Sequence, residues 1–164
     1  MAPSLKQTYR RILDLKAGIK GLVFLPITVA SLLVFVFFIL DFLNQFPLFN
    51  ISWLGYNIAI GPYADQGLIG VLPFLPFLVY TFIHVNYFEE YYFRTNLKRV
   101  VIWAFLHMVM GVSVSVALML LPLGFFYKYI YDNYGIDYAY ALHFSTNITI
   151  LLISVMSFIV ISDR

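Results

Sequence analysis

The chain has 164 residues, of which 62% are hydrophobic, 20% aromatic and 11% charged, and its mean hydropathy is +0.88. Soluble domains contain about 45–50% apolar and about 25% charged residues, so this composition excludes a disordered chain, a soluble enzyme and a coiled coil. The net charge of +2 is too small to indicate a nucleic-acid partner, and the absence of cysteine excludes disulfides, thiolate metal sites and cysteine nucleophiles. We therefore expect an all-α polytopic membrane protein whose first partner is the lipid bilayer.

Residues 1–20 contain half of the basic residues, and the apolar side chains among them fall near one helical face. This pattern is typical of a basic amphipathic helix that lies on the anionic cytoplasmic leaflet of a membrane. A secretory signal peptide is the competing interpretation. The apolar stretch that follows is too long for a signal peptide and has no small-residue cleavage site, so we expect it to be retained.

Residues 21–43 predict the first transmembrane span, with its apolar stretch between Leu22 and Leu40. Residues 44–67 follow as a loop rich in Gly, Pro, Asn and Asp, and no lysine or arginine occurs there. The positive-inside rule therefore places this loop outside and the N-terminus in the cytoplasm. Trp53 and Tyr56 suit the aromatic belt at the membrane interface.

The second span is predicted from Leu68 to Tyr92 and the last from Ala139 to Ile161. Between them, Val100 to Tyr131 is nearly all apolar. This stretch is too long for one span of ~20 residues and short for two spans with a turn between them. Charge does not decide between four and five spans, because either topology leaves nine of the ten cations inside: only Lys128 is outside with four spans, and only Arg164 with five.

Ionisable residues at membrane depth are costly, which makes them candidates for function. Glu90 and Arg94 are four residues apart, so they share one helical face and can form an ion pair. Glu89 lies about 100° around the helix from Glu90, away from that pair. A carboxylate with no cation of its own in a dry site suits a general base. His84 lies about 140° around the helix from Glu89, and we interpret it as structural or substrate-facing.

The positions of the other polar residues favour five spans. A helical hairpin that turns between Thr95 and Arg99 would set Glu89 and His107 at similar depth on two facing helices. His143 and Asn147 are four residues apart and share a face of the last span. They reach the depth of Glu89 only if the chain crosses the membrane twice between His107 and His143, so five spans are expected if these residues form one site.

Three short motifs lie on successive predicted spans: EEYYFR from Glu89 to Arg94, WAFLH from Trp103 to His107, and HFSTN from His143 to Asn147. They resemble the EExxxR, FxxxH and HxxxN motifs of the CPBP family of intramembrane proteases (CAAX-prenyl protease and bacteriocin-processing, or abortive-infection, proteins). The resemblance covers residues 68–161, which it implies form a four-helix catalytic core. The family usually has Phe where Trp103 stands, Gly where Thr95 stands, and a longer linker between the first two motifs.

The resemblance implies an intramembrane endopeptidase of the glutamate type. Glu89 and His107 would activate a water molecule for attack on a scissile carbonyl, and His143 and Asn147 would donate hydrogen bonds to the oxyanion. Amide hydrolysis requires such a base and such preorganised donors in a water-poor site.

The same resemblance gives Glu90 and Arg94 a supporting role, in which they fix the geometry of the catalytic groups. It implies no metal and no other cofactor. The substrate would be a peptide or a membrane protein, and the enzyme would be a multi-pass protein of the plasma membrane with a cytoplasmic N-terminus.

Other functions remain open from the sequence. Zinc held by Glu89, His107 and His143 would make a metalloprotease. His107 and His143 could instead ligate a b-type haem in a subunit of a membrane complex, or the chain could be a non-catalytic, CPBP-like scaffold. Taken singly, Glu89, Glu90 and Arg94 are explained by a charged helix end at the interface, and the two histidines by structural hydrogen bonds across helices.

Overall fold

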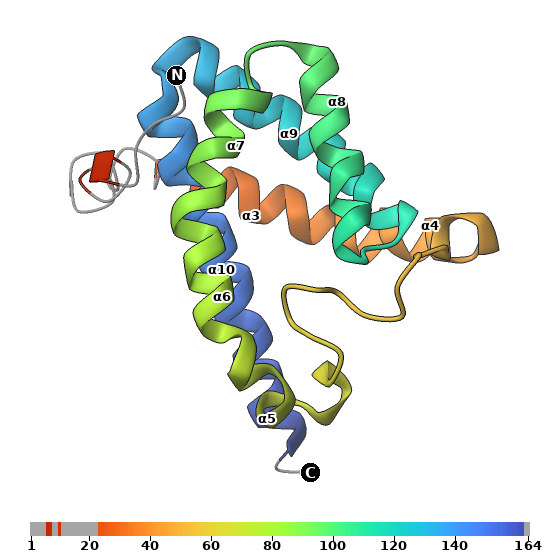
Figure 1. Cartoon of the computed structure of the whole chain (residues 1–164). Helices are drawn as coiled ribbons and strands as arrows, with labels where there is room; N and C mark the ends of the chain where they lie inside the picture. The colour runs from red at the N-terminus through yellow and green to blue at the C-terminus, as the bar shows by residue number, and fades with distance from the viewer. Residues whose placement is uncertain (1–5, 8–9, 11–22, 163–164) are drawn as a thin grey trace.

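The computed structural model of the protein describes residues 6–7, 10 and 23–162 (Figure 1). Every regular element in these residues is a helix, and they contain no strand. The expected all-α fold class is thereby confirmed for this part of the chain. The basic amphipathic helix predicted over residues 1–20 lies outside the described residues, except for Lys6, Gln7 and Arg10.

Three helical segments in the described residues are long and apolar enough to cross a membrane: Leu25–Asn44, Leu68–Phe93 and Val114–Tyr134. Large apolar side chains are exposed along them, among them Phe38 and Ile69. Exposed apolar surface of this kind is expected where side chains face lipid rather than water. The segments support a helical membrane protein.

The first of these segments consists of α3 (Leu25–Val34), the π-helical η1 (Phe35–Leu40) and α4 (Asp41–Asn44). In Figure 1 it runs across the bundle. The predicted outside loop follows, and within it the structure has two short 3-10 helices, η2 (Pro47–Asn50) and η3 (Ala64–Gln66).

The second segment is one helical run that contains the predicted second span. Its pieces are α5 (Leu68–Val71), η4 (Leu72–Phe74), α6 (Leu75–Tyr80), η5 (Thr81–Val85) and α7 (Asn86–Phe93). The narrow 3-10 turn of η4 contains Pro73, and Pro76 stands just after it. Proline has no N–H for the helical ladder, which favours a change of helix type at these positions.

The ambiguous apolar stretch from Val100 to Tyr131 forms parts of two helices. Helix α8 (Leu97–Leu106) continues as the 3-10 helix η6 (His107–Met110), and α9 (Val114–Tyr134) follows after a turn. Of these, α9 alone is among the three segments long enough to cross a membrane. The two-helix interpretation of this stretch is confirmed, whereas five complete spans are not established by the helix lengths.

Polar side chains and a glycine fix the turns around α8 and α9. Asn96 caps α8, since its Oδ1 accepts a hydrogen bond from the Arg99 N–H at 2.9 Å, and Ser113 caps α9. Gly111, between the helices, has φ +91°, and a Cβ there would clash with the carbonyl oxygen of Tyr56. Only glycine therefore allows the outside loop to lie against this turn.

The turn between α9 and α10 (Ile136–Ser162) is very short. Helix α9 continues to Tyr134, and Gly135, at φ +92°, makes the turn. Asp132 does not break the helix, because its carboxylate pairs with Lys128 one turn earlier, at 2.7 Å.

Helix α10 (Ile136–Ser162) has 27 residues and contains the whole of the predicted last span. It packs against α9 through a core whose buried members are Tyr127, Ile130, Ala139 and Leu142. Helices α6 and α7 run alongside α10 in Figure 1. The Tyr140 hydroxyl of α10 donates a hydrogen bond of 3.0 Å to the carbonyl of Ile83 in η5, which lies between α6 and α7.

Helices α8 and α9 approach closely at Gly124. A Cβ at this position would lie 2.8 Å from Cζ3 of Trp103 and 2.9 Å from Cγ1 of Val100. Trp103 is only 1% exposed, so its ring is held in a tight space between the helices. This close packing positions the indole beside the polar groups described below.

Two long-range hydrogen bonds show which segments lie side by side. The Ile58 N–H of the outside loop donates to the Met110 carbonyl at 2.7 Å. At the other end of α9, Lys128 Nζ donates to the Arg94 carbonyl at 3.1 Å. The turn after η6 thus lies beside the outside loop, and the later part of α9 lies beside the end of α7.

Candidate functional site

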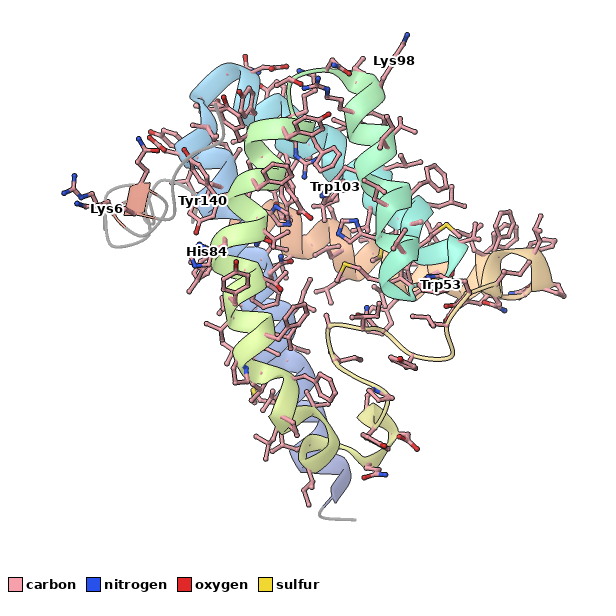
Figure 2. The ribbon with its side chains drawn as sticks, in the orientation of Figure 1. Lys6, Trp53, His84, Lys98, Trp103 and Tyr140 are labelled. Atoms are coloured by element: carbon pink, nitrogen blue, oxygen red, sulfur yellow. The ribbon has the colours of Figure 1, made fainter. Side chains whose placement is uncertain are left out.

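The four residues predicted to be catalytic line one cavity of about 280 Å³. Glu89 comes from α7, His107 from η6 directly after α8, and His143 and Asn147 from α10. The side chains between these helices are drawn in Figure 2. The packing of the helices thus brings together three motifs that are far apart in the sequence.

A buried ion pair lies behind the cavity. The side chains of Glu90 and Arg94 are 0% exposed, and Arg94 Nη2 lies 3.0 Å from Glu90 Oε1. Arg94 Nε is also 3.2 Å from each oxygen of the carboxylate. The pairing predicted from the spacing of four residues is confirmed, and it keeps both charges compensated in a setting where an unpaired charge is very costly.

The Glu90 carboxylate also accepts a hydrogen bond from α10. His143 Nδ1 lies 2.8 Å from Glu90 Oε1, although the two residues are 53 positions apart in the sequence. Glu90 therefore orients the His143 ring and ties α7 to α10. The supporting role in catalysis that the resemblance implies for Glu90 stays a prediction.

Aromatic rings surround the Arg94 guanidinium. Its central carbon lies 3.9 Å from the ring centroid of Trp103 and 5.5 Å from that of Tyr127, distances at which a cation is attracted to an aromatic ring. The same indole lies edge-on to His107 at 4.8 Å and to His143 at 5.8 Å between centroids. Trp103 therefore contacts all three polar groups, a central position that the sequence did not predict.

Hydrogen bonds assign the proton positions of the two histidines. His107 Nδ1 lies 2.8 Å from the carbonyl oxygen of Trp103, which can only accept, so Nδ1 carries the hydrogen and Nε2 of the neutral ring has a lone pair. His143 Nδ1 donates in the same way to the carboxylate of Glu90. His143 can then donate from Nε2 to an oxyanion only when its ring is doubly protonated.

Glu89 lies on the cavity, apart from the Glu90–Arg94 pair, and its side chain is 14% exposed. Its Oε2 is 3.8 Å from His143 Nε2. The sequence placed Glu89 opposite His107, and both do line the cavity. The contact between Glu89 and His143 was not predicted, because it depends on how α10 packs against α7.

The structure separates His84 from the other histidines. His84 does not line the cavity, and its ring lies 4.7 Å from the ring of Tyr80. This arrangement favours the structural interpretation of His84 over the substrate-facing one. In the described part of the chain, no group of three or more His, Asp or Glu side chains is arranged to hold a metal ion.

Sequence reasoning missed two polar residues near the site. Asn86 lines the cavity one turn before Glu89 and Glu90, and a search of the apolar spans for amides as well as for ionisable groups would have found it. Lys128, the one cation in a long apolar stretch, donates to the Arg94 carbonyl. Its isolation in the sequence was a signal of a buried partner.

Comparison of the chain with protein-family models, with curated proteins and with solved structures finds no match. The three motifs and the cavity that their residues line are therefore the features that point to a function.

Proposed function

We propose that the protein is an intramembrane endopeptidase that hydrolyses a peptide bond of a peptide or membrane-protein substrate. The observation that carries this proposal is the convergence of Glu89, His107, His143 and Asn147 on one cavity. They supply a base, a second proton acceptor and hydrogen-bond donors within one cavity, which is the set of groups that acyl transfer to water requires.

Glu89 and His107 activate the water in this proposal. The carboxylate of Glu89 and the lone pair on Nε2 of His107 both accept hydrogen bonds, so a water between them presents its oxygen to the scissile carbonyl carbon. As the oxygen attacks, its proton passes to one of these groups and then to the leaving amine nitrogen, which breaks the C–N bond. Proton transfer of this kind contributes typically 10²–10⁴-fold to a rate.

His143 and Asn147 stabilise the oxyanion. The Asn147 amide donates in any protonation state, and His143 donates from Nε2 as an imidazolium. Glu90 supports this role because its carboxylate, fixed by Arg94, holds Nδ1 of His143 at 2.8 Å. The His143 ring is therefore oriented before the substrate binds, which is the condition for effective oxyanion stabilisation.

The proposal includes five spans, a cytoplasmic N-terminus and a plasma-membrane location. Helix α8 with η6, and α10, would make the crossings beyond the three long segments. The hydrogen bond from Ile58 to Met110 supports this topology by joining the outside loop to the turn after η6, and the contact of Lys128 with Arg94 supports it at the cytoplasmic side. Arg164 is then the one cation outside.

The proposal is tested by cleavage of a quenched fluorescent peptide library by the purified protein in nanodiscs. We expect Glu89→Ala and His107→Ala each to abolish cleavage while the protein still inserts and purifies as the wild type does. Asp132→Ala is the matched control, since Asp132 pairs with Lys128 at a half-exposed position and is absent from the cavity lining. Turnover at the wild-type rate in Glu89→Ala would contradict the mechanism.

A further inference from the structure

Two buried nitrogen donors belong to residues that line the cavity. The side chains of Asn86 and Trp103 are 2% and 1% exposed, and both residues line the cavity together with Glu89 and His107. No atom in the described residues accepts a hydrogen bond from Nδ2 of Asn86 or from Nε1 of Trp103. Buried donors without an acceptor are rare because they lose their hydrogen bonds to water, so each one needs an explanation.

The known contacts of the site do not use these donors. The Glu90 carboxylate, one turn along α7 from Asn86, already pairs with Arg94 and accepts a hydrogen bond from His143. The Trp103 ring offers its face to the Arg94 guanidinium, and a phenylalanine would offer a similar face without an N–H. The contacts of the site therefore leave the indole N–H and the Asn86 amide unused, and both groups belong to residues of the cavity wall.

The surroundings select a neutral acceptor. Most of the cavity wall is apolar, with Val71, Leu78 and Phe82 among its residues. An anionic ligand would lie in the same small space as the Glu89 carboxylate, and like charges at close range in an apolar setting repel strongly. An amide carbonyl oxygen accepts hydrogen bonds and carries no net charge, so it fits both the donors and the wall.

We propose that Asn86 and Trp103 form a donor pair that binds a backbone carbonyl of the substrate, which makes the ligand of this cavity an uncharged, apolar peptide segment. The assignment of this ligand as a substrate rests on the proposed function. The pair binds substrate without taking part in proton transfer. Loss of one of these donors therefore acts mainly by raising KM, as removal of uniform binding does.

The experiment uses the two indole N–H signals in the NMR spectrum of protein labelled with ¹⁵N-tryptophan, since the chain has two tryptophans. The probe is acetyl-trileucine-amide, a neutral capped peptide. The Trp103 signal is expected to move downfield and to saturate as the peptide is added. Trp53 serves as the internal reference, because its indole already donates to the Met108 carbonyl.

The variants test the donor pair directly. We expect Asn86→Leu to weaken binding of the peptide about fivefold, the effect of losing one neutral hydrogen bond, and Trp103→Phe to do the same. Asn86→Ala also removes the donor, with a smaller side chain and no charge, and it serves if the leucine variant does not fold. A Trp103 signal that does not respond to the peptide, or unchanged affinity in the variants that fold, would overturn the proposal.

Two measurements separate this proposal from the proteolytic one: the NMR titration of Glu89→Ala with the peptide, and cleavage of the peptide library by the wild type. A Trp103 shift in Glu89→Ala together with no cleavage by the wild type supports the donor pair and contradicts the protease. Cleavage without the Trp103 shift contradicts the donor pair and leaves the protease standing. An equal Trp103 shift with the anionic probe acetyl-trileucine acid would overturn the selection of a neutral acceptor.

Discussion

Replacement of Glu90 by glutamine is expected to destabilise the fold as much as it damages the site. The glutamine keeps the shape of the side chain, so no cavity is created. It removes the negative charge that compensates Arg94 and that accepts the hydrogen bond of His143. The Arg94 guanidinium would then be buried without the charge of Glu90, between the rings of Trp103 and Tyr127 and a neutral amide.

The size of the effect follows from burial. Both side chains of the pair are 0% exposed, and removal of one partner from a buried ion pair costs about 3–5 kcal/mol. For a chain of this size, 1 kcal/mol corresponds to about 2–4 °C in melting temperature. We therefore expect Glu90→Gln to lower the melting temperature by roughly 6–20 °C.

The assay is thermal unfolding of the purified protein in one detergent, followed by tryptophan fluorescence. Asp132→Asn is the control, because it breaks an ion pair of the same spacing whose carboxylate is half-exposed, and such pairs contribute about 0.3–0.5 kcal/mol. If Glu90→Gln shifted the melting temperature by no more than Asp132→Asn does, the buried Glu90–Arg94 pair would not contribute the expected stability.

Further variants test the oxyanion site and two close contacts. Asn147→Ala should lower kcat by about 10²–10³ with little change in KM, the loss expected for one oxyanion donor, as measured by steady-state kinetics on a peptide from the library. Gly124→Ala should cost about 1–3 kcal/mol in thermal unfolding, because its Cβ would lie 2.8 Å from the buried Trp103 ring; an unchanged melting temperature would contradict the tight packing. Gly111→Ala should detach the outside loop from its turn, because the new Cβ would clash with the Tyr56 carbonyl. Limited proteolysis should then cut the loop faster than in the wild type, and equal rates would count against this contact.

Local geometry explains what could be predicted from the sequence. The Glu90–Arg94 pair depends only on the helical repeat, so a spacing of four residues was enough to predict it. The caps at Asn96 and Ser113 are equally local. His143 and Asn147 share the cavity for the same reason, since residues four apart on a helix lie on one face.

Contacts between helices could not be predicted in the same way. The hydrogen bond from His143 to Glu90 depends on how α7 and α10 pack, and that packing includes contacts between distant residues, such as the edge-on ring pair of Tyr87 and Tyr140. Hydropathy locates apolar segments, but it does not give the angle at which one helix packs against another. It therefore gave no sign that α3 runs across the bundle (Figure 1).

The most direct measurement is cleavage of the peptide library by the wild type and by Glu89→Ala, each with and without a strong zinc chelator. We expect the wild type to cleave in the presence of the chelator and the Glu89→Ala variant not to cleave at all. Cleavage that persists without Glu89, or that the chelator abolishes, would contradict a water activated by Glu89 and His107 without a metal.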